Sequence, residues 1–485
     1  MKYLDIEHAV ASYFHKYQQI ELHQMKICGE GRLSMSMSPA YWISKDGKNG
    51  GMSCDTYTYH IYKEKEEVQC EVEIKRLEVV CQEKICGAEI EQIQWDTIQV
   101  MKPVSYEREN PFESIGSYPA LSLKENANEQ DYLAIRNLQN MFYEHRLHET
   151  KELFSEKEDT MFTAECLEMN RVCGQRKILE AFAERLKKEQ ENNHCYLFLG
   201  ITGMPLIEIA EDGNHAKGIF MTQIYQIQAG LFEKDVDNWK LIRTMAVTNT
   251  EFIREKSEWN IHKMNIQNLV RLPNTPYRND GRYDKSGRSE EPWEIDQTTR
   301  CQPDTETAMK IENIINRWVY GCRRGELRQF IQNDMKNSKK KNHMLIRSFG
   351  KETPELEDYE AITEKIEDMT NQYKERYFTF HAPTTPVITC HPEENYILGT
   401  WFDTAATNLR SVAESLEDIP YMVFVNKYVH KFEKIDGHWC LTDFYAEPMI
   451  SLQDWKFDMI HSKGYVHTSE TGQYPQRFEL RGERL

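Results

Sequence analysis

An internal repeat constrains the fold of this chain more than any other feature of its sequence. Two stretches, 129–271 and 305–460, show the same order of predicted elements: a long amphipathic helix, a polar segment, a second helix and several long strands. Landmark residues keep nearly constant register between the stretches, 177 to 181 positions apart: Tyr143 and Tyr320, Pro205 and Pro386, Gly218 and Gly399, Trp259 and Trp439. Such a register indicates a repeated structural unit. The sequence therefore predicts two copies of one domain.

The length of the chain leaves room for more than these two copies. At 485 residues it exceeds the size, about 250–300 residues, at which a single hydrophobic core stops growing. Segments rich in Pro and Gly predict linkers. The predicted division is a β-rich N-terminal region over 1–125, a domain over 129–271, a linker over 272–304, a domain over 305–460 and a C-terminal tail over 461–485. The N-terminal region also begins with a helix that is followed by strands. A third, eroded copy of the same domain is therefore an open alternative for this region.

Composition narrows the classes of partner. Hydrophobic residues make up 40% of the chain and aromatic residues 11%, which is typical of a folded globular protein. The net charge of -18 repels phosphate backbones and anionic lipid surfaces, so neither nucleic acid nor a membrane is expected as a partner. No apolar run is long enough to span a bilayer, and the first residues show no secretory signal. We predict a cytoplasmic location.

Motifs for cofactors and metals are missing from the sequence. The twelve cysteines are scattered without the paired spacing of a zinc site. Gly200-Ile201-Thr202-Gly203 lacks the third glycine and the strand-to-helix context of a dinucleotide-binding loop. We therefore predict neither a cofactor nor a metal.

The predicted helices and strands fit a layered α+β architecture. Apolar residues on the first helix of each repeat lie on one face, which can cover a sheet: Ile135, Leu138 and Phe142 in the first copy, and Ile311, Ile315, Trp318 and Val319 in the second. Strands separated by tight turns predict curved, mostly antiparallel sheets. We expect tandem domains in which helices cover such sheets.

Five short motifs, in a fixed order, resemble those of a known superfamily. They are Gly174 to Phe182 with a Gly-x-x-x-Ile-x-x-x-Phe spacing, Pro205-Leu206-Ile207, Pro386-Val387-Ile388, Gly399-Thr400-Trp401 and the closing hairpin from Val429 to Trp439. The order is similar to that of the SnoaL-like (nuclear transport factor two-like) superfamily, which includes scytalone dehydratase, polyketide cyclases, ketosteroid isomerase and bile-acid dehydratase. The resemblance covers about 300 of the 485 residues. It implies cone-shaped α+β domains with a ligand pocket between the sheet and the first helix.

Strand alternation selects candidate residues in the domain over 305–460. Asn426, Tyr428 and His430 share one strand face with Phe424, and the preceding strand places Trp401 and Asp403 on one face. A histidine can exchange a proton near neutral pH, and a carboxylate can fix its tautomer. The resemblance implies catalytic roles for His381, His430 and Asp403, orienting or oxyanion roles for Asn426, Tyr428 and Tyr320, and substrate contacts for Trp401 and Phe424.

Structural roles compete with these functional ones. His430 and His381 could serve as hydrogen-bond partners only, Asp403 as a turn cap, and Trp401 and Tyr320 as core residues. The Tyr-Asp pair typical of catalytic members at the end of the first helix is missing here. In the domain over 129–271, the positions that correspond to Asp403, Asn426, Tyr428 and His430 are Thr222, Ala246, Thr248 and Thr250. That domain is predicted to be non-catalytic.

Two function classes follow. The first is a cofactor-independent lyase or isomerase of the dehydratase type that acts on an apolar cyclic or aromatic small molecule, with His381 and His430 sharing acid–base duty and Asp403 orienting one of them. The second is a non-catalytic ligand-binding or assembly protein built from tandem cone domains that pair within the chain or in a homo-oligomer. Pairing through the sheets would bury the face of Val423, Val425 and Val429.

Overall fold

Strands dominate the structure, which is a computed structural model of the chain. The residues that it describes are 1–2, 4–14, 31–64, 67–85, 87–103, 129–144, 153–191, 197–228, 239–277, 301–324, 327–336, 342–346, 355–375, 379–391, 395–408, 421–455 and 457–460. Within them the strands form three sheets, and all but a few of the strand pairs are antiparallel. The predicted α+β class with mostly antiparallel sheets is confirmed, whereas tandem copies of one domain remain a prediction.

The first sheet is built mainly from the N-terminal region. It contains β1 (Gly31–Ile43), β2 (Asn49–Glu64), β3 (Glu67–Glu83) and β4 (Ala88–Pro103) in sequence order, with the short β17 (Phe457–Ile460) paired to β4. Apolar residues at every fourth position, Ile6, Val10 and Phe14, turn one face of the helical residues 4–14 toward this sheet. The N-terminal region therefore has its own helix-on-sheet core.

The second sheet belongs to the stretch that begins with α2 (Glu129–Glu144). The chain continues through β5 (Met161–Ala164), η2 (Glu165–Leu167), β6 (Met169–Cys173), α3 (Gln175–Glu191), β7 (Leu197–Thr202), β8 (Leu206–Ile209), β9 (His215–Gln228), β10 (Trp239–Glu255) and β11 (Glu258–Tyr277). The strand order is β6-β5-β11-β10-β9-β7, and β8 also pairs with β9. Because β11 continues to Tyr277, the strand extends six residues into the stretch 272–304 that the sequence predicted to be a linker.

The third sheet carries the candidate site. Its elements are α4 (Thr305–Arg324), α5 (Leu327–Asp334), β12 (His343–Ile346), α6 (Tyr359–Glu375), β13 (Thr379–His391), β14 (Tyr396–Asn408), β15 (Tyr421–Ile435) and β16 (His438–Trp455). The strand order is β12-β16-β15-β14-β13. The short β12 pairs in parallel with β16, as β5 does with β11 in the second sheet.

The second and third sheets have the same pairing register. Thr222 lies opposite Ala246 in the second sheet, and Asp403 lies opposite Asn426 in the third. Isolated bridges also correspond, since Phe154 pairs with Ile261 and Met335 with Leu441. Members of these pairs are 180 or 181 positions apart, the offset of the sequence landmarks. These strand pairs therefore correspond between the second and third sheets.

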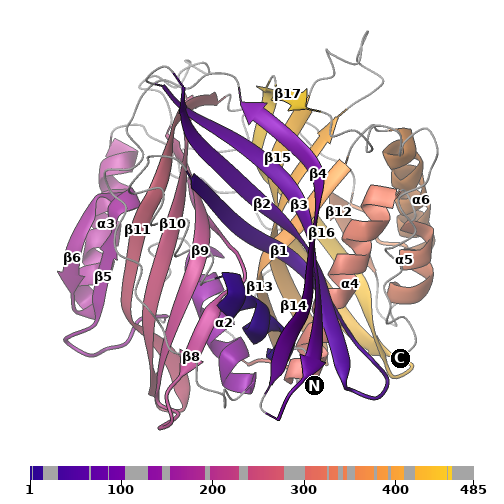
Figure 1. The fold of residues 1–485 in the computed structure, drawn as a ribbon, viewed down its shortest axis with the longest axis horizontal. Coiled ribbons are helices and arrows are strands. Elements are labelled where there is room, and N and C mark those ends of the chain that lie inside the picture. The colour runs from indigo at the N-terminus through magenta and orange to yellow at the C-terminus, as the bar shows by residue number, and fades with distance from the viewer. Residues whose placement is uncertain are drawn as a thin grey trace.

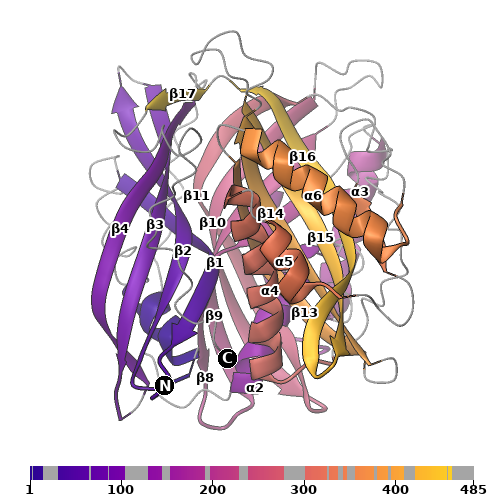
Figure 2. The ribbon, with the colours of Figure 1, turned by 90° about the vertical axis from the view of Figure 1, so that its right-hand side faces the viewer.

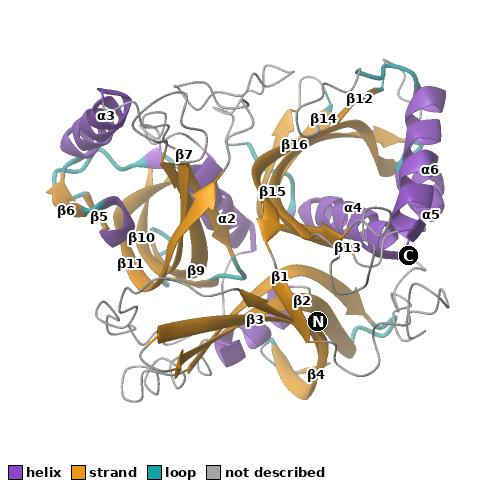
Figure 3. Cartoon of the chain, turned by 90° about the horizontal axis from the view of Figure 1, so that it is seen from above, coloured by secondary structure: helices purple, strands orange, loops and turns teal. Residues whose placement is uncertain are grey.

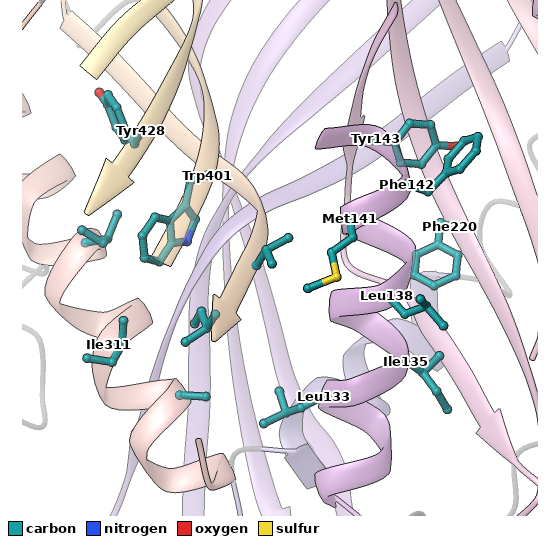
Figure 4. Packing of buried hydrophobic residues seen from close by; sticks show 14 of the residues in the cluster. Leu133, Ile135, Leu138, Met141, Phe142, Tyr143, Phe220, Ile311, Trp401 and Tyr428 are labelled. Carbon is teal, nitrogen blue, oxygen red and sulfur yellow. The ribbon is translucent and has the colours of Figure 1, made fainter. Parts of the chain in front are cut away.

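The three sheets lie around a shared centre, each with a helix on its inner side. Figure 1 shows the first sheet in front of the other two, Figure 2 shows it beside them, and Figure 3 shows the three from above. Helix α2 contacts both the second sheet and β13 of the third. Figure 4 shows this division, with Leu138 and Phe142 turned toward Phe220 and Met141 turned toward Trp401. Helix α2 thus belongs to the cores of two sheets.

Within the residues that the structure describes, no helix is both long enough and apolar enough to cross a lipid bilayer.

Candidate functional site

The candidate residues gather on the inner face of the third sheet, beneath α4. Across β14 and β15, Asp403 lies opposite Asn426, Trp401 opposite Tyr428, and Gly399 opposite His430. Residues directly opposite in an antiparallel pair point to the same face, so these side chains form one row. His381 comes from β13, the neighbouring strand, where it pairs with Ala405. The inner face continues into a core in which Trp318 of α4 contacts Phe444.

The carboxylate of Asp403 is the centre of the hydrogen bonds in this row. Its Oδ2 accepts from Nδ1 of His381 at 2.8 Å, from Nδ2 of Asn426 at 3.0 Å and from the hydroxyl of Tyr428 at 2.7 Å. Its Oδ1 accepts from the backbone N–H of Ala382 at 2.8 Å. Asp403 is fully buried, and four donors compensate its lost hydration.

This arrangement keeps Asp403 ionised and sets the tautomer of His381. Burial alone would raise the pKa of Asp403, but the charge and hydrogen bond of His381, with the bonds from Tyr428 and Asn426, outweigh it and lower the pKa. An ionised carboxylate only accepts hydrogen bonds, so Nδ1 of His381 carries the proton. The ring nitrogen suited to take up a further proton is then Nε2.

His430 lies in the same row but in a different environment. Its side chain is fully buried, with ring centroids of Phe444, Tyr428 and Trp401 at 4.4, 5.3 and 5.7 Å. Within the described part of the chain, neither ring nitrogen has a hydrogen-bond partner. Burial lowers the pKa of His430 to about 3, although the Val429 backbone and the attraction of Asp403 both oppose this effect. The imidazole is therefore neutral at physiological pH.

The structure places the other predicted residues as follows. Tyr428 and Asn426 hold Asp403, and Trp401 is a buried core residue that packs against Phe432. Tyr320 lies on α4 and Phe424 on β15, but their side chains are outside the described residues. In the described ranges, no group of three or more His, Cys, Asp or Glu side chains is arranged to hold a metal ion.

The corresponding row of the second sheet carries no ionisable pair. The hydroxyl groups of Thr222 and Thr248 lie 3.2 Å apart, and Thr248 also shares a 2.6 Å hydrogen bond with the hydroxyl of Tyr143. Gly200, 181 positions before His381, occupies the corresponding place on β7. A Cβ atom at Gly200 would lie 2.0 Å from the Tyr143 ring. The ring of Tyr143 thus fills the space that His381 would need.

Sequence reasoning missed three charged residues that meet between the sheets. Glu7 from the helical residues 4–14, Arg136 from α2 and Glu312 from α4 all line a cavity of about 50 Å³. Each is at most 9% exposed. The signal that could have revealed them is a charged residue within an otherwise apolar helix face, since charged residues are almost never fully buried unless paired.

Comparison with known proteins gives only partial likenesses. No family model matches the chain, and no curated protein sequence matches it. A solved structure of hexachlorocyclohexane dehydrochlorinase LinA-type3 from Novosphingobium barchaimii LL02 is 10% identical, covers 30% of this chain and 90% of its own, and has a TM-score of 0.25.

Two further structures are similar to the same extent. A protein from Streptomyces avermitilis, named as a dehydratase of the NTF2-like family, is 12% identical over 30% of this chain and 98% of its own, with a TM-score of 0.25. A protein from Novosphingobium aromaticivorans DSM 12444, named as a scytalone dehydratase, is 12% identical over 33% of this chain and 94% of its own, with a TM-score of 0.24.

Proposed function

We propose that the third sheet and its helices form a cofactor-independent lyase or isomerase of the dehydratase type, acting on an apolar cyclic or aromatic small molecule. The observation that carries the proposal is the buried His381–Asp403 pair with its supporting bonds from Asn426 and Tyr428. Perturbed, buried titratable groups that share hydrogen bonds are typical of acid–base sites.

The proposed reaction uses His381 as the base. Nε2 of His381 removes a proton from a carbon beside a carbonyl group, and the electron pair of that bond moves toward the carbonyl. Asp403 stabilises the imidazolium that forms, because its charge lies 2.8 Å from Nδ1. The imidazolium then gives the proton to a hydroxyl group on the next carbon, which leaves as water, so that a double bond replaces one C–H and one C–O bond.

The two histidines have different roles in this scheme. With its pKa lowered to about 3, His430 is a poor proton carrier near neutral pH. Its ring nitrogens, which have no partner among the described residues, are instead suited to a hydrogen bond with the carbonyl or hydroxyl group of the substrate, beside the rings of Trp401, Tyr428 and Phe444. We therefore assign proton transfer to His381 and substrate binding to His430, instead of an equal share.

The alternative, an assembly or binding protein without catalysis, has one observation in its favour. The face of β15 opposite the candidate site is also buried, with Val425 at 1% and Val429 at 0% exposure. Burial of this face is what sheet-to-sheet pairing requires. The two functions can coexist, because pairing uses one face of the sheet and the candidate site the other.

The test is turnover of cyclic β-hydroxy ketones of the decalone and steroid type by the purified chain, followed by the ultraviolet absorbance of the conjugated product. Asp403→Asn should abolish turnover and Tyr428→Phe should reduce it. Tyr143→Phe is the matched control, since it removes one buried tyrosine hydroxyl, which bonds to Thr248 of the second sheet, and should leave turnover unchanged.

A thermal-shift screen of the same compounds separates binding from catalysis. A ligand at about 100 times its dissociation constant should add about 2.7 kcal/mol to the free energy of unfolding. Compounds that stabilise the chain but are never converted would favour the alternative. Equal turnover by the wild-type chain and Asp403→Asn would refute the assignment of the site.

A further inference from the structure

All three sheets have a break in the regular pairing of their strands at a corresponding position. The register of β1 against β2 shifts between Met37 and Ala40, and that of β13 against β14 shifts between Thr384 and Val387. In the second sheet, the break between β7 and β8 is at the same register along β9. Each break has a proline directly before the strand resumes, and these three prolines line one cavity: Pro39, Pro205 and Pro386. The first sheet therefore repeats the geometry of the other two.

The first helix of each unit contributes a charge to the same cavity. Each unit is a helix with its sheet: residues 4–14 with the first sheet, α2 with the second and α4 with the third. Arg136 pairs with Glu312, and the carboxylate of Glu7 accepts hydrogen bonds from the hydroxyls of Tyr132 at 2.6 Å and Tyr41 at 2.9 Å. The charges of three units are therefore combined in one buried cluster.

Two hydrogen bonds between units run in the same direction around the shared centre. Asn140 of the second unit donates to the carbonyl of Pro386 in the third at 2.7 Å. Asn316, 176 positions later in the third unit, donates to the carbonyl of Pro39 in the first, also at 2.7 Å. Equivalent donors thus reach equivalent acceptors in the next unit. This is the relation that neighbouring subunits of a ring have to one another.

The second unit also contacts the strand that carries His381. Asn137 donates to the carbonyl of Ile388 at 2.9 Å, and the backbone N–H of Thr202 donates to the hydroxyl of Thr385 at 2.9 Å. With Asn140, these bonds hold β13 at its register shift, between His381 and the end of the strand. The second unit therefore supports the third where its strand is most irregular.

The charges at the cavity argue for assembly within one chain. Three identical subunits around this point would bring three like charges together, which is costly in a buried site. Here the units differ, and the cation of Arg136 pairs with Glu312 and also attracts the carboxylate of Glu7. Burial raises the pKa of Glu312, with Glu7 adding to the effect and Arg136 opposing it. The charges of Glu7, Arg136 and Glu312 are complementary only because each unit supplies a different one of these residues.

We propose that the first two units act as built-in partner subunits of the third, so that one chain forms the complete assembly and works as a monomer. The units interact through a junction formed by Glu7, Arg136 and Glu312 with the three prolines. All of these residues belong to the same chain, so no second chain is needed. The proposal does not depend on catalysis by the third unit.

Native mass spectrometry of the full chain tests the stoichiometry. One chain, 57.5 kDa, is expected at low and at high micromolar concentration. A stable dimer or trimer would overturn the proposal. Calorimetry tests the coupling of the units, which should unfold in one cooperative transition because they share buried contacts. Three independent transitions in the wild-type chain would also overturn it.

Hydrogen–deuterium exchange of the Arg136→Met chain tests the junction itself. Exchange should become faster in residues 4–14, α2 and α4 together, because both carboxylates lose their counter-charge. Arg317→Met is the matched control, since it breaks an ion pair with Asp334 inside the third unit and should affect only α4 and α5. Faster exchange confined to α2 in Arg136→Met would refute the junction.

A second variant covers the case in which Arg136→Met does not fold. The triple change Glu7→Gln, Arg136→Met and Glu312→Gln removes all three charges, so no buried charge is left unpaired. We expect this chain to be a monomer with a melting temperature near that of the wild type and slow exchange in all three helices. Failure of the triple variant to recover these properties would show that the charges do not act as one cluster.

Discussion

Replacing His430 by phenylalanine should change how the stability of the protein depends on pH. The His430 ring is fully buried among aromatic rings, and burial lowers its pKa from 6.5 to about 3. In the unfolded chain the ring is hydrated and protonates near pH 6.5. As the pH falls below this value, the unfolded state gains a proton that the folded state does not bind, so acidification favours unfolding.

The size of the effect follows from the two pKa values. A difference of roughly 3.5 units corresponds to about 5 kcal/mol once the pH is below both values. Between about pH 7.5 and 4.5, only the unfolded state titrates at this residue, and the loss is about 3 kcal/mol. His430→Phe removes the titrating group and should lose about 3 kcal/mol less than the wild-type chain over the same interval.

The assay is urea unfolding followed by tryptophan fluorescence at both pH values for the two chains. At neutral pH, His430→Phe should be as stable as the wild-type chain or more stable, because it removes two buried nitrogens that have no partner in the described residues. His438→Phe is the control, since His438 is exposed and the same chemical change is then made outside the core.

Parallel stability curves for His430→Phe and the wild type would refute the reasoning. They would mean that the His430 ring is hydrated in the folded protein or takes up its proton at an ordinary pH. A large loss of stability at neutral pH would instead show that the nitrogens of His430 have a partner that contributes to folding.

Three further predictions concern single contacts. Asp403→Asn should lower the free energy of unfolding by about 2 kcal/mol or more, because four buried hydrogen bonds lose their charged acceptor; a loss near zero in urea unfolding would contradict the pairing. Gly399→Ala should displace the ring of Trp401, since the new Cβ would lie 2.2 Å from it; unchanged near-ultraviolet circular dichroism would speak against this. Oxidised glutathione should convert the thiols of Cys301 and Cys390, whose sulfur atoms lie 2.8 Å apart, to a disulfide with release of two reduced glutathione molecules; alkylation of both thiols after treatment would disprove it.

Strand periodicity was enough to predict which side chains share the candidate face. Alternation along β15 places Asn426, Tyr428 and His430 together, and the structure has them in one row. Periodicity cannot say which histidine meets Asp403, because that depends on register across strands. Asp403 lies opposite Asn426, two inward positions from His430, whereas β13 brings His381 to the carboxylate.

Contacts between distant parts of the chain could not be predicted from the sequence. The pairing of β17 with β4 joins residues more than 350 positions apart, and no local pattern encodes it. The junction of Glu7, Arg136 and Glu312 is similar, because a charge on an apolar helix face does not show which distant charge it meets. The first unit also departs from the landmarks of the other two, so its likeness to them becomes clear with the register shift before Ala40.

The ring of Tyr143 explains why polar substitutions alone would not turn the second unit into a second site. Thr222→Asp would place a carboxylate where the third unit has Asp403, but Gly200→His would drive its side chain into the Tyr143 ring. The carboxylate would then be buried without its histidine, which is costly. Truncation of Tyr143 has to accompany both changes, and it would open space in a core that Phe142 and Phe198 also line. The difference between the units therefore lies in packing as much as in the identity of the polar residues.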